Sequence, residues 1–295
     1  MEFPDFSDSG VRLPIRPEGI AFDLDGTLLD HDGRLDESVA RAVRLIAKAG
    51  IKVFLVTGRQ LSSCEPFWRE LELTTPLATC NGACVGFPGR EPFFHLRLSR
   101  IARDAILRLG DAYDLYINYY IDNQVYTLKD SSERDWYSRR FYPVKYLPDR
   151  DDPVFRRLPT KCLCVVPEND LERLSETFSD ALENQAVVTS SNNRCIEIIP
   201  PGADKALGIK TLADWAKIPM EHFIAVGDAM NDLPMLREAG FSITFKSGDP
   251  NLANQVDMII PPLWEDGIDV LAKCVLGLSY SGRFLTPRSR RFFKK

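Results

Sequence analysis

The chain has 295 residues, of which 44% are hydrophobic and 27% are charged, and its formal net charge is −5. This length predicts one large or two ordinary globular domains, and the apolar content excludes a disordered or fibrous chain. The small net charge does not favour nucleic acid as a partner, and no stretch reaches the roughly 18 apolar residues of a membrane span. The acidic start of the chain differs from a signal peptide, so we expect a cytoplasmic protein without a membrane partner.

The seven cysteines are the next feature of the composition. Their count is odd, and no two of them form a C-x-x-C pair, so the spacing of a metal finger is absent. We expect buried, reduced thiols, which fit a reducing compartment.

The first part of the chain alternates short apolar strands with helices. Strands are predicted over 19–24, 51–56 and 76–80, and helices over 36–49 and about 60–71. Strands that alternate with helices in this way indicate an α/β domain with a parallel sheet.

The pattern changes after about residue 86, where strand-like runs and helical stretches are mixed. Asp122-Asn123 lies between two strand-like runs and suggests a hairpin turn. The region is therefore predicted to be an α+β insert, with a loop excursion over 143–160 that contains four prolines. The expected strands of the insert cover 93–98, 115–121, 124–129 and 161–166, and its expected helices cover about 99–112 and 168–183.

The first pattern returns near residue 195, so the parallel domain is predicted to be split by the insert. Basic residues at the end of the chain predict a solvated tail, with a weak anionic contact surface as the alternative. The expected strands cover 195–200, 222–227 and 241–245, and the expected helices cover about 204–216 and 232–239. The expected boundaries are 17–86 and 190–280 for the split domain, 87–189 for the insert and 281–295 for the tail.

Four polar clusters follow predicted strands of the split domain, at the carboxyl ends where open α/β sheets bind ligands. The first contains Asp23 and Asp25, followed by Gly26. Asp23 can attack an electrophile and carry it covalently, and Asp25 can donate and remove protons. Two acids this close together also attract a hard cation. A plain capping turn is the alternative interpretation.

The second and third clusters offer groups that bind an anion. Thr57-Gly58-Arg59 presents a hydroxyl and backbone N–H groups where a helix begins, and these can hold a phosphate oxygen. Lys205 lies in the first turn of a predicted helix, where its charge opposes the helix dipole, so a nearby anion explains it better. An ordinary turn and a surface lysine are the respective alternatives.

The fourth cluster is Gly227-Asp228-Ala229-Met230-Asn231-Asp232. Three oxygen-bearing side chains within five residues suit Mg²⁺, which takes one or two carboxylates together with water and phosphate. A capped helix start explains these acids only in part. Taken together, the four clusters supply a nucleophilic carboxylate, an acid/base, a hydroxyl, an ammonium and a metal site, which is the chemistry of phosphoryl transfer.

On these motifs the sequence resembles the haloacid dehalogenase superfamily, specifically its Cof-type phosphatases. The resemblance covers 17–86 and 190–270, and the insert matches in its position and its α+β make-up. It implies an α/β fold with a Rossmann-like parallel-sheet core and an inserted α+β cap domain. The matching motifs are DLDGTL (23–28), TGR (57–59), NGA (81–83), Lys205 and GDAMNDLPML (227–236).

The resemblance also implies roles for single residues. Asp23 would be the nucleophile that forms an aspartyl-phosphate, and Asp25 would protonate the leaving group and later activate water. Thr57 would bind the transferring phosphate, and Lys205 would neutralise its charge. The implied substrate-binding residues are Thr57, Gly58, Arg59, Asn81 and Lys205, and the implied Mg²⁺ site comprises Asp23, Asp25, Asp228, Asn231 and Asp232.

The expected function is hydrolysis of a small phosphorylated metabolite, such as a sugar phosphate, by a Mg²⁺-dependent enzyme that is a monomer by default. A sugar phosphomutase and a non-catalytic phosphate-binding module on the same scaffold are the alternatives. The segment TFKSGDPN (244–251) departs from the loop usual in Cof-type members. With Pro234, the fourth motif resembles that of related sugar-phosphate phosphatases. The motifs therefore leave the identity of the substrate open.

Overall fold

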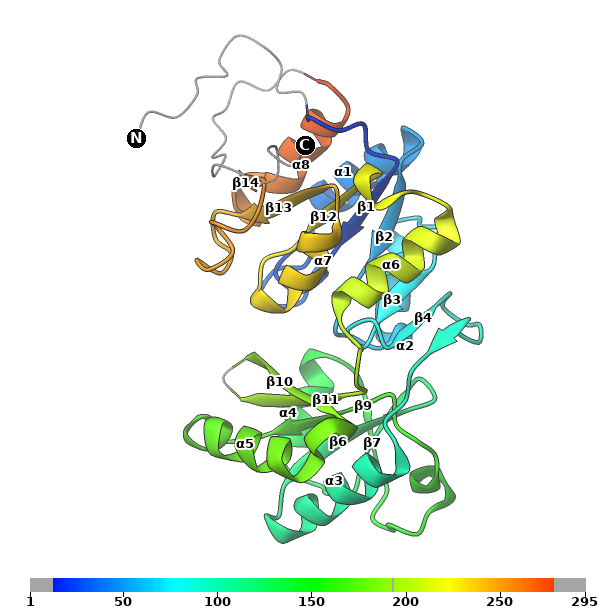
Figure 1. The fold of residues 1–295 in the computed structure, drawn as a ribbon, viewed down its shortest axis with the longest axis vertical. Coiled ribbons are helices and arrows are strands. Elements are labelled where there is room, and N and C mark those ends of the chain that lie inside the picture. The colour runs from blue at the N-terminus through cyan, green and yellow to red at the C-terminus, as the bar shows by residue number, and fades with distance from the viewer. Residues whose placement is uncertain (1–12, 193, 279–295) are drawn as a thin grey trace. The chain divides into compact units, whose positions relative to one another are not determined.

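The computed structural model describes residues 13–192 and 194–278, which divide into two compact units (Figure 1). The expected tail over 281–295 lies outside the described residues. Residues 79–86 and 190–203, which the sequence prediction assigned to the split domain, belong to the second unit. The described part of the first unit comprises 13–57, Glu65–Ala78 and 204–278, and the second comprises Gly58–Cys64 and Thr79–Ala203.

The first unit is built on a five-stranded sheet in the order β14-β13-β12-β1-β2. Every neighbouring pair is parallel, so the carboxyl ends of the strands share one edge. Every residue of the two central strands, β1 and β12, is buried, as expected for a parallel sheet covered on both faces. The strands are β1 (Gly19–Phe22), β2 (Lys52–Leu55), β12 (Phe223–Val226), β13 (Phe241–Phe245) and β14 (Met258–Ile260).

Helices cover both faces of this sheet, with α1 packed against α8 and α6 against α7 (Figure 1). The helix α1 begins after Asp36, whose side chain accepts a hydrogen bond from the Ser38 amide, and it buries Val39, Val43 and Ile46 as its helical spacing predicted. The α/β architecture predicted from the sequence is therefore confirmed. The helices are α1 (Glu37–Lys48), α2 (Leu61–Glu70), which is divided between the units, α6 (Lys205–Ala216), α7 (Leu233–Glu238) and α8 (Gly267–Val275).

The second unit contains a six-stranded sheet in the order β10-β11-β9-β6-β7-β8, antiparallel except for the β7–β8 pair. Its main core lies between the sheet and the helices α3 (Arg100–Ala112) and α5 (Leu171–Leu182). Asp122 and Asn123 both adopt positive φ between β6 and β7, which confirms the predicted hairpin turn. The strands are β6 (Tyr116–Ile121), β7 (Gln124–Thr127), β8 (Val144–Tyr146), β9 (Lys161–Val165), β10 (Val187–Asn192) and β11 (Cys195–Ile199).

One strand was assigned to the wrong sheet. The run over 195–200 forms β11, but β11 pairs antiparallel with β9 and β10 instead of joining the parallel sheet. The run over 76–80 contains β3 (Leu77–Thr79), which is joined to the chain after β2 by a parallel bridge between Val56 and Ala78 and also forms a three-stranded sheet with β4 (Cys84–Gly86) and β5 (Phe94–His95). A short apolar run fits the interior of either kind of sheet, because burial and not pairing direction sets its composition.

Several elements were not predicted at all. The helix α4 (Ser132–Arg140) is highly polar, and the expected loop over 143–160 contains both β8 and a short 3₁₀ helix, Pro153–Arg156. All seven cysteines are buried thiols, as expected. None of the helices in the described residues combines the length and the apolarity that a membrane crossing requires.

Candidate active site

The first predicted cluster lies directly after β1, at the carboxyl edge of the parallel sheet. Asp23 is 5% exposed, and its amide donates a hydrogen bond to the carbonyl of Val226 at 3.0 Å. The chain then turns at Gly26, whose φ is +86°, and a Cβ at this position would collide with the carboxylate of Asp228. Only glycine fits here, because it tolerates this φ and leaves room for the neighbouring carboxylate.

Lys205 is the first residue of α6, and it is buried beside two carboxylates. Its Nζ donates to Asp23 Oδ1 at 2.6 Å and to Asp232 Oδ1 at 2.5 Å. Burial alone would lower the pKa of Lys205, but the two carboxylates outweigh it and raise the pKa above its ordinary value. The site therefore contains a fixed positive charge in contact with Asp23.

Asp232 is fully buried, and both of its carboxylate oxygens are occupied. One oxygen accepts from Lys205, and the other accepts from the amides of Asp228 at 2.9 Å and Ala229 at 3.0 Å. A Cβ on Gly227 would lie 2.5 Å from Asp232, so glycine is needed for this close approach. Asp232 thus fixes the loop that presents Asp228.

Asp228 is partly buried and accepts a hydrogen bond from Thr27 Oγ1 at 2.8 Å. Burial, with the negative charge of Asp232 next in size, raises the pKa of Asp228 to about 6. Burial also raises the pKa of Asp23 well above its ordinary range, and the neighbouring acids add to this effect while Lys205 opposes it. Negative charge therefore exceeds positive charge in this cluster.

The donor set of the cluster fits a hard cation. One carboxylate oxygen each from Asp23, Asp228 and Asp232 lies within 4.8 Å of the others. Oxygen ligands of this kind suit Mg²⁺, and a cation there would offset the repulsion between the acids. Asp25 and Asn231 are exposed, and they do not belong to this group of three.

Thr57 lies at the same edge of the sheet, where its strand β2 pairs in parallel with β1. Its side chain is completely buried, and its amide donates to the carbonyl of Ala78 at 2.9 Å. The structure thus brings Asp23, Lys205, Asp228 and Asp232 together at one edge of the sheet, with Thr57 following the neighbouring strand.

The remaining predicted residues, Gly58, Arg59 and Asn81, belong to the second unit. Arg59 accepts a hydrogen bond through its carbonyl from the amide of Cys80 at 2.8 Å. Asn81 is 6% exposed and has a positive φ of 53°. Two buried charged residues next to these loops, Lys161 and Glu197, were not predicted. Each is the single charged residue of an otherwise apolar run, over 161–166 and 195–200, and this pattern could have indicated a buried, paired charge.

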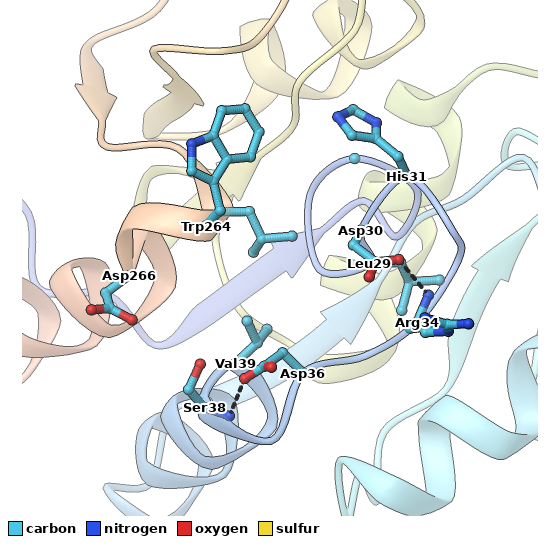
Figure 2. Close-up of a pocket in the computed structure, with 11 residues that line it drawn as sticks. Leu29, Asp30, His31, Arg34, Asp36, Ser38, Val39, Trp264 and Asp266 are labelled. Atoms are coloured by element: carbon cyan, nitrogen blue, oxygen red, sulfur yellow. Dashed lines mark hydrogen bonds between the residues drawn. The ribbon is translucent and has the colours of Figure 1, made fainter.

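A cavity of about 370 Å³ opens beside Gly26 (Figure 2). It lies between the loop after β1 and the start of α8, where Trp264 is 66% exposed. Two acidic side chains in its lining form local hydrogen bonds with the backbone. Asp30 accepts from the Arg34 amide at 2.8 Å, and Asp36 accepts from the Ser38 amide at 2.7 Å. The carboxylates of Asp30 and Asp36 in the lining of this cavity are therefore explained by local turn and cap hydrogen bonds.

Comparison with known proteins identifies the family of the chain. The sequence profile of the haloacid dehalogenase-like hydrolases matches residues 20–270. The chain is 26% identical to the 5-amino-6-(5-phospho-D-ribitylamino)uracil phosphatase YitU of Bacillus subtilis, over 87% of this chain and 96% of that protein. It is 30% identical to the HMP-PP phosphatase of Cronobacter sakazakii, over 79% of this chain and 85% of that protein.

The fold is also known from solved structures. A haloacid dehalogenase-like hydrolase from Bacteroides thetaiotaomicron superposes with a TM-score of 0.80 at 22% identity, covering 87% of this chain and 98% of that one. At this identity the likeness shows the fold, while the sequence profile extends over most of the chain and shows the family. The resemblance stated from the motifs is confirmed: the chain belongs to the haloacid dehalogenase-like hydrolases, as an enzyme of the phosphoric monoester hydrolase class.

Proposed function

We propose that this enzyme is a Mg²⁺-dependent phosphatase that hydrolyses a small phosphorylated metabolite through an aspartyl-phosphate on Asp23. The observation that carries the proposal is the buried contact of Lys205 with both Asp23 and Asp232. A fixed positive charge beside a nucleophilic carboxylate stabilises the charge that moves during phosphoryl transfer. The phosphatases among the relatives support the same class of substrate.

In the first half of the reaction, a carboxylate oxygen of Asp23 attacks the phosphorus atom of the substrate. The bond from this oxygen to phosphorus forms while the bond from phosphorus to the leaving oxygen breaks, and Asp25 gives its proton to the leaving oxygen. Lys205 and the hydroxyl of Thr57 hold the oxygens of the transferring group. An alcohol leaves, and the phosphoryl group stays on Asp23.

In the second half, Asp25 acts as a base. It takes a proton from a water molecule, whose oxygen bonds to phosphorus while the bond between phosphorus and Asp23 breaks. The products are inorganic phosphate and the free carboxylate of Asp23. The exposure of Asp25 supports this role, because an exposed carboxyl can exchange protons with the leaving group and with water.

The metal ion would be held by Asp23 and Asp228, together with the backbone carbonyl of Asp25. Asp232 would orient this site and not ligate the ion directly, since both of its oxygens already accept hydrogen bonds. Asn231 would act through water. Bound Mg²⁺ would supply neutralisation of the charge on the phosphoryl oxygens.

The substrate class we propose is a sugar phosphate or a similar phosphomonoester. One of the relatives is named as a phosphatase of a phosphorylated ribityl compound, which has this chemistry. Gly58, Arg59 and Asn81 would contact the substrate. The seven buried thiols support a reducing compartment such as the cytoplasm.

The test is release of inorganic phosphate from phenyl phosphate and from a panel of sugar phosphates, with Mg²⁺ and with EDTA. We expect activity that requires Mg²⁺ and falls at least about 10³-fold in Asp23→Asn, because loss of a nucleophile removes the whole covalent route. Asp180→Asn, an identical change at an exposed site in α5, should leave activity unchanged.

Two outcomes would contradict the proposal. One is full activity in Asp23→Asn or in EDTA. The other is transfer of phosphate between sugar hydroxyls, dependent on a sugar bisphosphate and without release of inorganic phosphate, which would indicate a mutase.

A further inference from the structure

The cavity beside Gly26 is lined by side chains that the reaction scheme above does not use (Figure 2). All of its lining residues belong to the first unit, so the whole cavity lies within one unit. Its volume of about 370 Å³ falls within the range of small-molecule sites, which is about 300–1,000 Å³. The cavity is therefore large enough for a compound with one ring and a short side chain.

The walls of the cavity are held in place by contacts within the first unit. Two walls are the starts of α1 and α8, and these helices pack against each other. The third wall is the loop after β1, where the Gly26 amide donates to the Leu29 carbonyl at 3.0 Å and the Leu29 amide donates to the Leu24 carbonyl at 2.8 Å. A ligand would therefore meet a preformed site that it does not have to order on binding.

Part of the lining is apolar and aromatic. The indole of Trp264 is 66% exposed, and its ring centroid lies 6.2 Å from that of His31. Leu29, Val39 and Leu263 add aliphatic surface to the same cavity. An apolar ring can pack against these side chains, and the face of an indole also attracts a cation placed over it.

The polar part of the lining consists mainly of carboxylates with oxygens available to a ligand. The turn around Asp30 uses only its Oδ1, and among the described residues no donor reaches its Oδ2. Asp266 begins α8 without a capping hydrogen bond from its side chain. Hydrogen bonds from Ser38 hold the pKa of Asp36 below its ordinary value, so this carboxyl is ionised at neutral pH.

The balance of charge around the cavity is negative. Arg34 is the basic side chain of the lining, but it is 79% exposed and lies 3.6 Å from Asp32, which is outside the lining. The starts of α1 and α8 contribute about half a positive charge each, and the full charges of Asp36 and Asp266 exceed this. Asp30 adds a further negative charge, so the cavity favours a cation.

We propose that this cavity is a binding site for a small organic ammonium compound. Its apolar or aromatic body would lie against Trp264, and its ammonium group would donate to the carboxylates of Asp30, Asp36 and Asp266. An ammonium group suits this lining because it has donors only, while carboxylates have acceptors only. The same charges disfavour a phosphate ester, so the site is separate from the substrate site proposed above. The inference goes beyond the proposed function and does not rest on it.

The test compares three probes of similar shape and different charge, which are benzylammonium, benzyl alcohol and phenylacetate. Titrations of the full chain, followed by saturation-transfer NMR of each probe, give the three dissociation constants. We expect about 1 mM for benzylammonium, as for a fragment of this size, at least about fivefold weaker binding of benzyl alcohol, and no saturable binding of phenylacetate.

The position of the probe is tested by the indole N–H resonances of the ¹⁵N-labelled protein. Benzylammonium should shift the resonance of Trp264, which is assigned by its loss in Trp264→Leu. The resonances of Trp68, Trp136 and Trp215 should stay in place, because these residues are outside the lining.

Matched variants measure the contribution of each side chain. Trp264→Leu should weaken benzylammonium binding at least about fivefold. Asp30→Asn and Asp266→Asn should each weaken it about threefold, because each removes one charge while asparagine keeps an acceptor and tolerates the φ of +60° at 266. Trp215→Leu and Asp214→Asn make the same changes at exposed sites in α6 and should leave the dissociation constant unchanged.

Three results would overturn the inference. One is equal affinity for the three probes, and another is unchanged benzylammonium binding in Trp264→Leu. The third is loss of binding in Asp23→Asn without loss in Trp264→Leu, which would place the cation in the carboxylate cluster. Benzylammonium binding that persists in Asp23→Asn, with Mg²⁺ and with EDTA, is the expected result. A wild type that binds benzylammonium but releases no phosphate would overturn the proposed function and support this inference.

Discussion

The two units each bury one lysine, and the two lysines differ in the charge that surrounds them. Lys205 contacts Asp23 and Asp232, and further acids nearby leave the cluster with more negative than positive charge. Lys161 contacts the single carboxylate of Glu197, and its other hydrogen-bond acceptor is a neutral carbonyl.

This difference distinguishes chemistry from positioning. Burial, together with the excess of negative charge in the first cluster, raises the pKa of Asp23 and Asp228, and a bound metal ion would offset that excess charge. The balanced pair in the second unit has no such excess, so its charges serve geometry. A buried ion pair whose charges are hydrogen-bonded holds the groups around it in one arrangement.

The largest expected effect concerns stability in the second unit. Lys161→Met leaves Glu197 as an unpaired buried charge and should lower the free energy of unfolding by about 3–5 kcal/mol. Lys161→Met/Glu197→Met should come within about 1 kcal/mol of the wild type, because no charge is stranded. Urea denaturation measures both. A pair variant as unstable as the single one would mean that the pair itself supplies the stability.

The next effect concerns turnover. Lys205→Met removes the fixed charge beside the nucleophile and should lower kcat on phenyl phosphate by about 10²–10³-fold. Lys161→Met, in the fraction that is folded, should keep kcat on this substrate within a few-fold, because the hydrogen bonds of Lys161 lie within the second unit and do not involve the carboxylate cluster. Steady-state kinetics at saturating Mg²⁺ measure kcat for both variants. Similar losses of kcat in the two variants would contradict the distinction between the two lysines.

Metal binding gives a smaller effect, confined to the first unit. Saturating Mg²⁺ should stabilise the wild type by about 1–3 kcal/mol, because the ion binds the folded carboxylate cluster and not the unfolded chain. Asp228→Asn keeps the hydrogen bond from Thr27 but loses the charge, so it should need at least about tenfold more Mg²⁺ for the same shift. Thermal unfolding across a Mg²⁺ titration measures this. An unchanged titration midpoint would remove Asp228 from the proposed metal site.

The smallest effect is the response of the second unit to pH. Burial, followed by the charge of Arg97, lowers the pKa of His95 to about 4 from 6.5, and His95 Nε2 lies 2.7 Å from Thr160 Oγ1. The unfolded chain therefore takes up a proton before the folded one, so stability is complete above about pH 6.5 and falls as the pH drops toward 4. His95→Gln should lose less stability than the wild type as the pH falls over this window. The difference between the two proteins should be under about 1 kcal/mol, because the ring is half exposed. Parallel pH profiles in the two proteins would contradict this.

The gathering of the first cluster could be predicted because parallel strands place their carboxyl ends on one edge. Asp23, Lys205 and Asp228 are far apart in the chain, but each follows a predicted strand or begins a predicted helix, so sheet topology brings them together. The sequence also indicated the turn at Gly26, where the structure requires a residue without a side chain.

The second cluster could not be predicted, for physical reasons. Lys161 and Glu197 lie within otherwise apolar runs, and their contact depends on the antiparallel register of β9 and β11. Local patterns carry no information about that register, and the sequence analysis assigned the run at 195–200 to the other sheet. The orientation of the Asn81 amide follows from the same long-range contact, so only the structure could reveal it.

The most direct test of the central claim is to locate the phosphoryl group during turnover. Asp25→Asn, mixed with phenyl phosphate and Mg²⁺, should form the covalent intermediate, because phenol is a good leaving group, but hydrolyse it slowly without the base. Rapid acid quench and peptide mapping should then find the phosphoryl group on Asp23, and hydroxylamine should release it, as expected for an acyl phosphate. Release of phenol with the phosphoryl group on another residue, or with no enzyme-bound phosphate at any time, would contradict the account.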